Sequence, residues 1–312
     1  MIFHSKAPNS VLNRLLHLIS QFSITHGTFE TNIPFLSLLR EVKPTVVEYG
    51  FLNPSICIVI QGNKKVVIGK KSIEYGAGNY IASSIDMPIK GQVSKASPET
   101  PYTAIRIAFT SEEIASVVLE ANIIPAEVNH LREGAFVGNI GREVLMVLER
   151  LLNLSSDSQA AAFLTPAMKR EIIYRLLTGE DGEMFYNNML LHHEASGVSK
   201  AIHYVKANFE RSLTVDQIAR VGNMSVSTLH HKFKAITTLT PIQYQKQLRL
   251  QEARRILLSG GADVTRAAFQ VGYESLTQFN REYKRLFGLP PLKDIQAIRT
   301  KPNVNVKQST RP

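Results

Sequence analysis

Two sets of polar side chains recur at the same spacing, fifty positions apart, in this chain of 312 residues. The first set is Ser227, His230, His231 and Lys234, and the second is Thr277, Asn280, Arg281 and Lys284. Both sets follow the i, i+3, i+4, i+7 spacing of one helix face. Hydroxyl, imidazole, amide and guanidinium groups can hydrogen-bond to DNA base edges, and lysines can contact phosphates. These side chains are therefore suited to contact nucleic acid.

The elements that must position these side chains are two predicted helix-turn-helix motifs. In the first, Thr214 predicts an N-cap for the helix VDQIARVG, Gly222 ends that helix, and Ser225 caps the next helix, VSTLHHKFKAI. In the second, Ala268, Gly272, Ser275, Phe279 and Tyr283 stand fifty residues after Ile218, Gly222, Ser225, Leu229 and Phe233. Matching inward positions and differing outward positions predict two copies of one scaffold with different contact surfaces. Plain αα-hairpins without a nucleic-acid role are the alternative.

A helix is predicted between the two motifs. Thr240 is its N-cap, Pro241 stands at the first helical position, and the helix extends from Ile242 to about Leu258. This spacer is ~25 Å long. It can place two recognition helices in successive major-groove segments, which lie ~34 Å apart on one face of DNA. We therefore expect one polypeptide to carry two DNA-reading heads.

The positive charge of the chain is concentrated near its C-terminus. The formal net charge is +10. Residues 1–199 contain 17 Lys and Arg against 19 Asp and Glu, whereas residues 200–312 contain 19 against 7. Clustered cations release counterions from a phosphate backbone, so this asymmetry favours a C-terminal domain that binds a polyanion. A basic surface that only aids solubility is the alternative.

The region before the motifs combines strands and helices. From about Thr45 to Phe109, short β-branched and aromatic runs alternate with Gly, Asn, Pro and Lys, which predicts an antiparallel β-barrel or sandwich. Helices are predicted over 10–22 and, after the strands, over 114–120, 143–154, 166–177 and 183–193, with Ser111 as the N-cap of the first of these. The apolar residues of 143–154 predict either packing on the barrel or a dimer interface.

The small, polar stretch ASGVSKA, residues 195–201, coincides with the shift in charge and predicts the domain boundary. We expect a first domain over 1–195, a DNA-binding domain over 196–298 and a loose tail over 299–312. The single cysteine, Cys57, excludes an internal disulfide and suits a reducing cytoplasm. No signal peptide or membrane-spanning run is expected.

Residues 213–291 resemble the double helix-turn-helix domain of the AraC/XylS family of transcription regulators, down to the closing VGYES and FNREYKRLFGLPP. Upstream, PSICIVIQGNKKVVIGKKSIEYGAGNYIASSIDMPIKGQV is similar to the N-terminal effector-type domain of one branch of that family. The resemblance implies an α+β two-domain fold: a cupin-like antiparallel β-barrel with flanking helices, followed by an all-α double helix-turn-helix. It implies a DNA-binding activator that contacts RNA polymerase, with a barrel that senses a small molecule or forms a homodimer.

Carried over by position, the family's base-reading residues fall on Ser227, His230, His231, Leu276, Thr277, Asn280 and Arg281. Leu276 offers only apolar contact, for example to a thymine methyl, whereas Arg281 can bind guanine O6 and N7 together. Ser225, Lys234 and Lys284 complete the predicted DNA-binding set. A constitutive DNA binder whose barrel only dimerises is the second hypothesis.

Metal and cofactor binding are not expected. His230 and His231 are adjacent on a helix and point about 100° apart, which does not favour chelation of one metal ion. No histidine stands between His26 and His130, so a cupin-type metal site is disfavoured, and GxSxG, HExxH and Walker motifs are missing. A small-molecule-binding barrel with enzymatic activity is thus a distant third hypothesis. Ile58, Ile60 and Tyr80 are predicted to line the barrel as core residues.

Overall fold

A computed structural model describes residues 9–124, 134–191 and 197–299. The chain divides into two compact units. The first holds the residues up to Ser199 together with Ala235–Thr238, and the second holds Lys200–Lys234 and the residues from Leu239 onward. No helix among the described residues is both long enough and apolar enough to cross a lipid bilayer.

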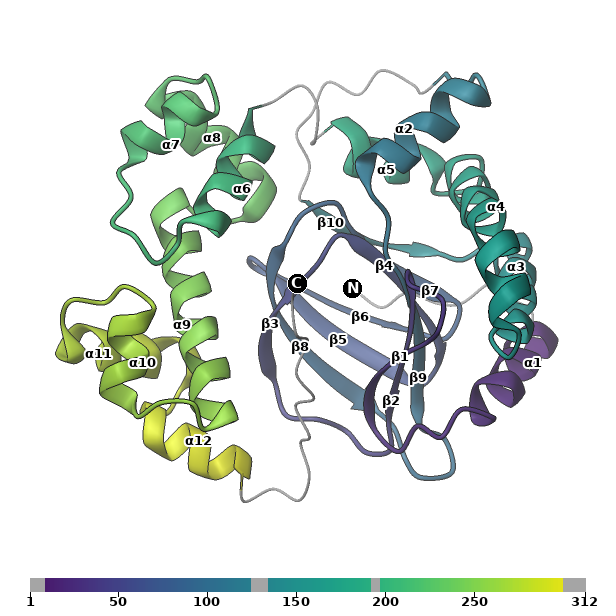
Figure 1. The fold of residues 1–312 in the computed structure, drawn as a ribbon, viewed down its shortest axis with the longest axis horizontal. Coiled ribbons are helices and arrows are strands. Elements are labelled where there is room, and N and C mark those ends of the chain that lie inside the picture. The colour runs from purple at the N-terminus through teal and green to yellow at the C-terminus, as the bar shows by residue number, and fades with distance from the viewer. Residues whose placement is uncertain (1–8, 125–133, 192–196, 300–312) are drawn as a thin grey trace. The chain divides into compact units, whose positions relative to one another are not determined.

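The first unit contains two antiparallel sheets (Figure 1). The larger sheet has the order β1 (Gly27–Glu30), β2 (Leu36–Glu41), β9 (Tyr102–Ile107), β4 (Ser55–Gln61), β7 (Asn79–Ser83) and β10 (Ala135–Asn139). The smaller sheet has the order β3 (Glu48–Leu52), β8 (Met87–Lys95), β5 (Asn63–Ile68) and β6 (Lys71–Gly76). The predicted antiparallel β-unit with flanking helices is confirmed. The sheets are not closed into a barrel, because β1, β10, β3 and β6 each pair on one side only.

Helices cover one face of the larger sheet. They are α1 (Asn9–Ser20), α2 (Ser111–Glu120), α3 (Arg142–Leu154), α4 (Ser158–Leu177) and α5 (Gly182–Tyr186), followed by a π-helical turn, Asn187–Leu191. α1 packs on α3, and α3 packs on α4 (Figure 1). Strand side chains alternate between the two faces of a sheet, so Ile56, Ile58 and Ile60 all join the buried cluster under these helices.

Three sequence-based expectations for this unit are corrected by the structure. Ile58, Ile60 and Tyr80 are buried core residues, as predicted, but the core they join is the one under the helices and not the space between the sheets. Thr110, not Ser111, caps α2: its Oγ1 accepts from the Glu113 amide at 3.2 Å, and the Glu113 carboxylate accepts from the Thr110 amide at 2.9 Å. The helix expected over 166–177 starts at Ser158, because Asp157 caps its first turn.

The region expected as one helix over 183–193 is a short α5 followed by the π-helical turn, and 192–193 lie outside the described residues. The structure also decides the role of α3. Its apolar residues Val144, Leu145, Leu148, Leu151 and Leu152 are buried in the same core as α1 and the sheet. The apolar side of α3 is therefore packed within the unit and is not available as a dimer interface.

The second unit is all-helical. Its helices are α6 (Val198–Ala207), α7 (Val215–Val221), α8 (Val226–Thr237), α9 (Pro241–Ser259), α10 (Val264–Gln270), α11 (Leu276–Phe287) and α12 (Pro291–Arg299). The first two residues of α6 and the last three of α8 are grouped with the first unit. α7 and α8 lie toward one end of α9, and α10, α11 and α12 lie toward the other (Figure 1). The 19 residues of α9 make it about 28 Å long. Thr240 caps α9 and Pro241 follows it, as the sequence predicts.

Candidate nucleic-acid interface

The first helix-turn-helix motif is held by caps at both helix starts. Thr214 Oγ1 accepts from the Gln217 amide at 3.2 Å, and Ser225 Oγ accepts from the Thr228 amide at 3.1 Å. Leu229 and Phe233 are fully buried on the inward face of α8. Because the inner face is fixed in this way, the opposite face of α8 is directed to solvent.

The second motif has the same plan. Asp263 Oδ1 accepts from the Arg266 amide at 2.8 Å and caps α10, while Ser275 Oγ accepts from the Gln278 amide at 3.3 Å and caps α11. Phe279 and Tyr283 are fully buried, with ring centroids 5.5 Å apart. The predicted inward positions of α11 are confirmed.

The two turns do not align at their glycines. Met224 N donates to the Ala219 carbonyl and Tyr273 N donates to the Ala268 carbonyl, both at 3.0 Å. The left-handed residue preceding each donor is Asn223, with φ of 50°, and Gly272, with φ of 89°. The expected equivalence of Gly222 with Gly272 is therefore wrong: Gly222 has φ of −79° and lies one residue earlier.

The second turn is one residue longer than the first. The N-caps Thr214 and Asp263 are 49 positions apart, whereas the N-caps Ser225 and Ser275 are 50 apart. The additional residue is Glu274, between the left-handed turn and the cap of α11. Exact fifty-residue periodicity thus holds for the recognition helices only.

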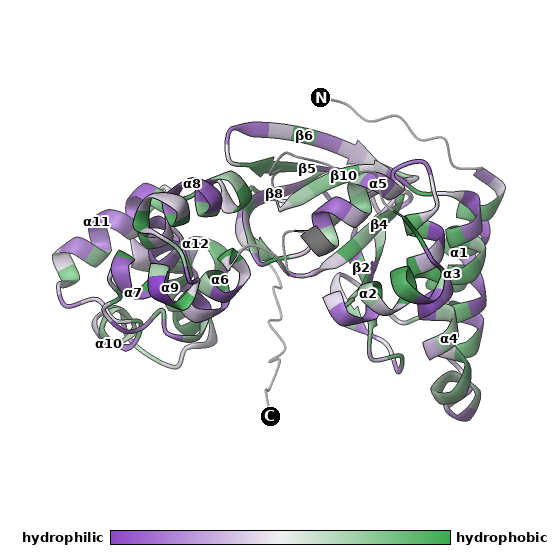
Figure 2. Ribbon diagram, turned by 90° about the horizontal axis from the view of Figure 1, so that it is seen from above, coloured by the Kyte–Doolittle hydropathy of each residue, from purple (hydrophilic) through white to green (hydrophobic). Residues whose placement is uncertain are grey.

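The predicted contact residues gather on the two recognition helices. Ser227, His231 and Lys234 on α8 are exposed and His230 is half-buried; Thr277, Arg281 and Lys284 on α11 are exposed, and Leu276 and Asn280 are half-buried. Ser225 is exposed, but its hydroxyl is engaged as a cap. Within residues 197–299, the Arg281 guanidinium and the Lys284 and Lys234 ammonium groups form no hydrogen bond or ion pair. Hydrophilic residues predominate along α11 (Figure 2).

A buried carboxylate anchors α11 to α9. Glu282 accepts from Lys246 Nζ at 2.7 Å, from the Tyr273 hydroxyl at 2.8 Å and from Gln278 Nε2 at 3.3 Å. Burial raises the pKa of the Glu282 carboxyl, but these three donors outweigh burial and hold the pKa below its usual range. The charged form of Glu282 is therefore the structural form.

A second buried carboxylate anchors α11 to α12. Arg254 forms a two-pronged ion pair with Asp294, at 2.8 and 2.9 Å, and the Tyr283 hydroxyl donates to Asp294 at 2.8 Å. The Arg254 guanidinium also lies 4.5 Å from the centroid of the Phe287 ring. Together these contacts fix the helix that carries Arg281.

Arg249 of α9 binds the backbone carbonyls of two connecting segments. Its guanidinium donates to the carbonyls of Phe209 at 2.6 Å, Gly272 at 2.7 Å and Arg211 at 2.8 Å. Gln245 donates to the same Phe209 and Arg211 carbonyls, at 2.9 and 2.7 Å. The chain between α6 and α7 and the turn of the second motif are thus both tied to α9.

The sequence did not predict these anchoring residues, which are Gln245, Lys246, Arg249, Arg254, Glu282 and Asp294. The available signal was the position of Glu282, which stands between the inward-facing Phe279 and Tyr283 and is charged where a helix is expected to be buried. Among the described residues, no group of three His, Cys, Asp or Glu side chains is placed to hold a metal ion.

A two-sheet unit followed by paired helix-turn-helix motifs defines the class: a two-domain protein with a DNA-binding fold. Residues 32–184 match the family described as the AraC-type transcriptional regulator N-terminus, and residues 218–296 match a helix-turn-helix domain family. The chain belongs to the AraC-type transcriptional regulators.

The curated relatives are regulators by name. The HTH-type transcriptional regulator ArgR of Pseudomonas aeruginosa is 27% identical over 150 residues, covering 48% of this chain and 46% of ArgR. The probable thc operon regulatory protein of Rhodococcus erythropolis is 30% identical over 167 residues, or 51% and 50% of the two chains. The HTH-type transcriptional activator RhaS of Escherichia coli is 27% identical over 154 residues, or 49% and 54%. The chain spans about half the length of these relatives.

Solved structures of ToxT from Vibrio cholerae share the fold. One has a TM-score of 0.56 at 14% identity, covering 84% of this chain and 97% of ToxT. The structure of unsaturated fatty acid bound wild-type ToxT has a TM-score of 0.53 at 13% identity, covering 86% and 96%. At these identities the likeness shows the fold alone.

Proposed function

We propose that the protein is a sequence-specific, double-stranded-DNA-binding transcription regulator without catalytic activity. α8 and α11 enter the major groove. Bases are read from α8 by Ser227, His230 and His231, and from α11 by Leu276, Thr277, Asn280 and Arg281. The DNA phosphate backbone is contacted by Ser225, Lys234 and Lys284. The observation that carries this proposal is the pair of capped recognition helices on one basic unit, whose outward cations have no partner within the described C-terminal part.

The proposed partners beyond DNA are RNA polymerase, a second copy of the chain and a small-molecule effector. RhaS is named as an activator, and ToxT has been solved with an unsaturated fatty acid bound, which supports activation and effector sensing as roles here too. We place the sensing unit at 1–195, the DNA reader at 196–298 and a tail at 299–312, in a cytoplasmic protein. Most of that tail lies outside the described residues.

Salt dependence of binding tests the proposal. The affinity of the full chain for fluorescent duplex DNA is measured by anisotropy between 50 and 200 mM salt. A reader that neutralises six to ten phosphates should lose about a thousandfold or more in affinity over this range. An affinity for duplex DNA that is absent at 50 mM salt, or independent of salt, would overturn the proposal.

The second hypothesis, a constitutive DNA binder whose N-terminal unit only dimerises, draws support from close packing between the sheets. Val66, Ile68, Tyr75, Met87 and Tyr102 expose at most 1% of their surface. Any effector in that space must displace side chains. A metabolite thermal-shift screen combined with light scattering distinguishes the two hypotheses. Saturable stabilisation by a compound supports sensing, whereas a stable dimer with no stabilising compound supports dimerisation alone.

A further inference from the structure

Four polar residues lie side by side across the larger sheet. Glu30 pairs with Ser37, Ser37 with Arg106, and Arg106 with Cys57 in the strand registers. Residues directly opposite each other in a sheet point to the same face, which here is the face turned away from the helices. The row therefore runs from an exposed acid at the edge strand β1 to a buried thiol on β4.

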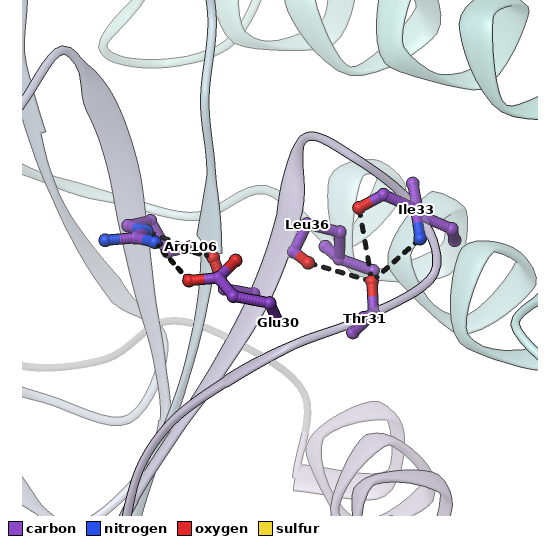
Figure 3. Close-up of polar contacts among 6 residues, drawn as sticks. Glu30, Thr31, Ile33, Leu36 and Arg106 are labelled. Carbon is purple, nitrogen blue, oxygen red and sulfur yellow. Dashed lines mark hydrogen bonds and ion pairs between the residues drawn. The ribbon is translucent and has the colours of Figure 1, made fainter. Parts of the chain in front are cut away.

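The Arg106 guanidinium is held from one side and satisfied only in part. Its Nε and Nη2 donate to Ser37 Oγ at 3.1 and 2.9 Å, and Nη2 also donates to Glu30 Oε1 at 2.9 Å (Figure 3). Ser37 is buried and fixes the orientation of the Arg106 guanidinium. Nη1 has no partner within the described ranges. Arg106 thus presents an oriented, partly open fork of the kind that binds carboxylates.

Glu30 is a weak occupant of this fork. The side chains of Arg106 and Glu30 are 36% and 67% exposed. An ion pair at such exposure contributes only about 0–1 kcal/mol, because solvent screens it. A carboxylate from solution can therefore compete with the Glu30 carboxylate for the same guanidinium.

Exchange of the occupant requires only the Glu30 side chain to move. The next residue, Thr31, locks the turn between β1 and β2: its hydroxyl donates to the Leu36 carbonyl at 2.8 Å and accepts from the Ile33 amide at 3.1 Å (Figure 3). The Thr31 amide also donates to the Leu36 carbonyl at 3.3 Å. The backbone that carries Glu30 is fixed while its carboxylate is free to leave.

The surroundings favour a ligand with one negative charge and an apolar body. Leu39 is two residues from Ser37 on the same face and is only half-buried, so it offers apolar surface beside the guanidinium. On the other side, burial raises the pKa of the Cys57 thiol, which keeps that neighbour neutral, and the charges of Lys64 and Arg106 offset part of the rise. The Arg106 guanidinium can neutralise one negative charge, and the nearby Glu30 carboxylate repels a second. The site therefore disfavours a dianion such as phosphate.

We propose that Arg106 is the receptor for the carboxylate of a small apolar monocarboxylate, that Ser37 orients its guanidinium, and that Glu30 occupies the fork in the ligand-free protein as an internal competitor. This inference rests on the proposed role of the N-terminal unit as a small-molecule sensor, and it names the chemical class sensed.

Calorimetric titration of the full chain with hexanoate tests the site, with hexanamide and inorganic phosphate as comparison probes. The wild-type protein should bind hexanoate saturably and should bind neither hexanamide nor inorganic phosphate. Glu30→Gln should bind hexanoate about 2–5-fold more tightly, since a competitor worth up to about 1 kcal/mol is removed. Arg106→Gln and Arg106→Lys should lose binding. Misfolding does not produce a gain of affinity, so Glu30→Gln keeps the test valid if an Arg106 variant is unstable.

The matched control is Glu149→Gln, which breaks an exposed Arg–Glu pair of the same type, between Arg14 and Glu149 at 2.7 Å, away from the site. Its affinity for hexanoate should equal that of wild type. No saturable hexanoate binding by either wild type or Glu30→Gln, or equal binding by Arg106→Gln, would overturn the proposal.

A DNA-binding measurement distinguishes failure of the carboxylate site from failure of the proposed sensing function. Hexanoate is titrated into the complex of the protein with duplex DNA. Arg106-dependent binding that leaves DNA affinity unchanged upholds the carboxylate site and argues against sensing by this unit. A hexanoate-induced change in DNA affinity that persists in Arg106→Gln supports sensing by this unit but overturns the assignment of Arg106 as the carboxylate receptor.

Discussion

The Lys246 ammonium group lies 2.7 Å from the Glu282 carboxylate and joins the spacer helix α9 to the second recognition helix α11. Only 7% of the Glu282 side chain is exposed. The position of the Arg281 side chain, one residue away, therefore depends on a charge pair whose carboxylate is buried. The orientation of the second reading head is set from within the scaffold.

Replacing Glu282 with Gln should loosen α11. The change leaves Lys246 without its counterion and Tyr273 with a weaker acceptor, so the free energy of opening of α11 should fall by about 1–3 kcal/mol. Native-state hydrogen exchange at the α11 amides of the full chain measures it. Glu252→Gln is the control, because its partner Arg255 is exposed, and it should change the same quantity by less than about 0.5 kcal/mol.

The same carboxylate predicts a pH dependence. The folded-state pKa of Glu282 lies below its usual value, so its contribution to stability is present above the unfolded pKa of about 4.3 and is lost as pH falls through the folded value. The stability difference between wild type and Glu282→Gln should therefore be constant from pH 7 to 5 and shrink on further acidification. A difference that grows below pH 4 would contradict the assignment of Glu282 as the charged anchor.

Gly272→Ala should unfold the second turn. Gly272 has φ of +89°, and an added Cβ would lie 1.9 Å from the Glu210 carbonyl oxygen. Gly288 has φ of +83° but open space around the same position. Gly288→Ala should thus cost only the backbone strain, about 1–2 kcal/mol, whereas Gly272→Ala should cost clearly more. Thermal unfolding of both variants compares them, and equal losses would show that the Glu210 contact is unimportant.

Two tyrosines should respond in opposite ways to loss of the hydroxyl. The Tyr102 hydroxyl is buried and has no hydrogen-bond partner within the described part of the chain. Tyr102→Phe should leave stability unchanged or raise it by up to about 1 kcal/mol. Tyr283→Phe removes a donor to Asp294 and should lower stability by about 1–2 kcal/mol. Calorimetric unfolding decides, and a large loss in Tyr102→Phe would refute its unpaired state.

Arg281 and Lys234 should differ in what they contribute to DNA binding. Arg281→Ala should cost about 1–3 kcal/mol on a preferred site and relax the preference at one base pair, whereas Lys234→Ala should weaken all sequences alike. Competition binding on preferred and random duplexes measures both. Equal losses on the two DNAs for Arg281→Ala would show that it contacts phosphate only.

The motifs were predictable because caps and apolar spacing are local signals. Thr214, Ser225, Thr240 and Ser275 act as the N-caps that their residue types predict. The turn register was not predictable by glycine matching, since Asn223 also adopts the left-handed conformation and takes the place of a glycine. Likewise, a fifty-residue repeat concealed the additional turn residue Glu274.

Half of the larger sheet escaped the sequence reasoning. β1 has four residues, β10 contains a glycine, and the leucine-rich β2 (LSLLRE) has no β-branched residues. Local propensity is weak in all three, and pairing with strands distant in sequence decides their structure. The anchors of α11 were missed for a related reason: Lys246 and Arg254, the cationic partners of Glu282 and Asp294, lie 36 and 40 residues away from them in the chain.

Selection of binding sites from random duplex DNA by the full chain, at two salt concentrations, tests the central claim most directly. If α8 and α11 both read bases, the selected sites should contain two short conserved blocks about one helical turn apart, ~34 Å. Arg281→Ala should then degrade one block and spare the other. A single block, or none, with binding that stays strongly salt-sensitive, would contradict the account of two reading heads.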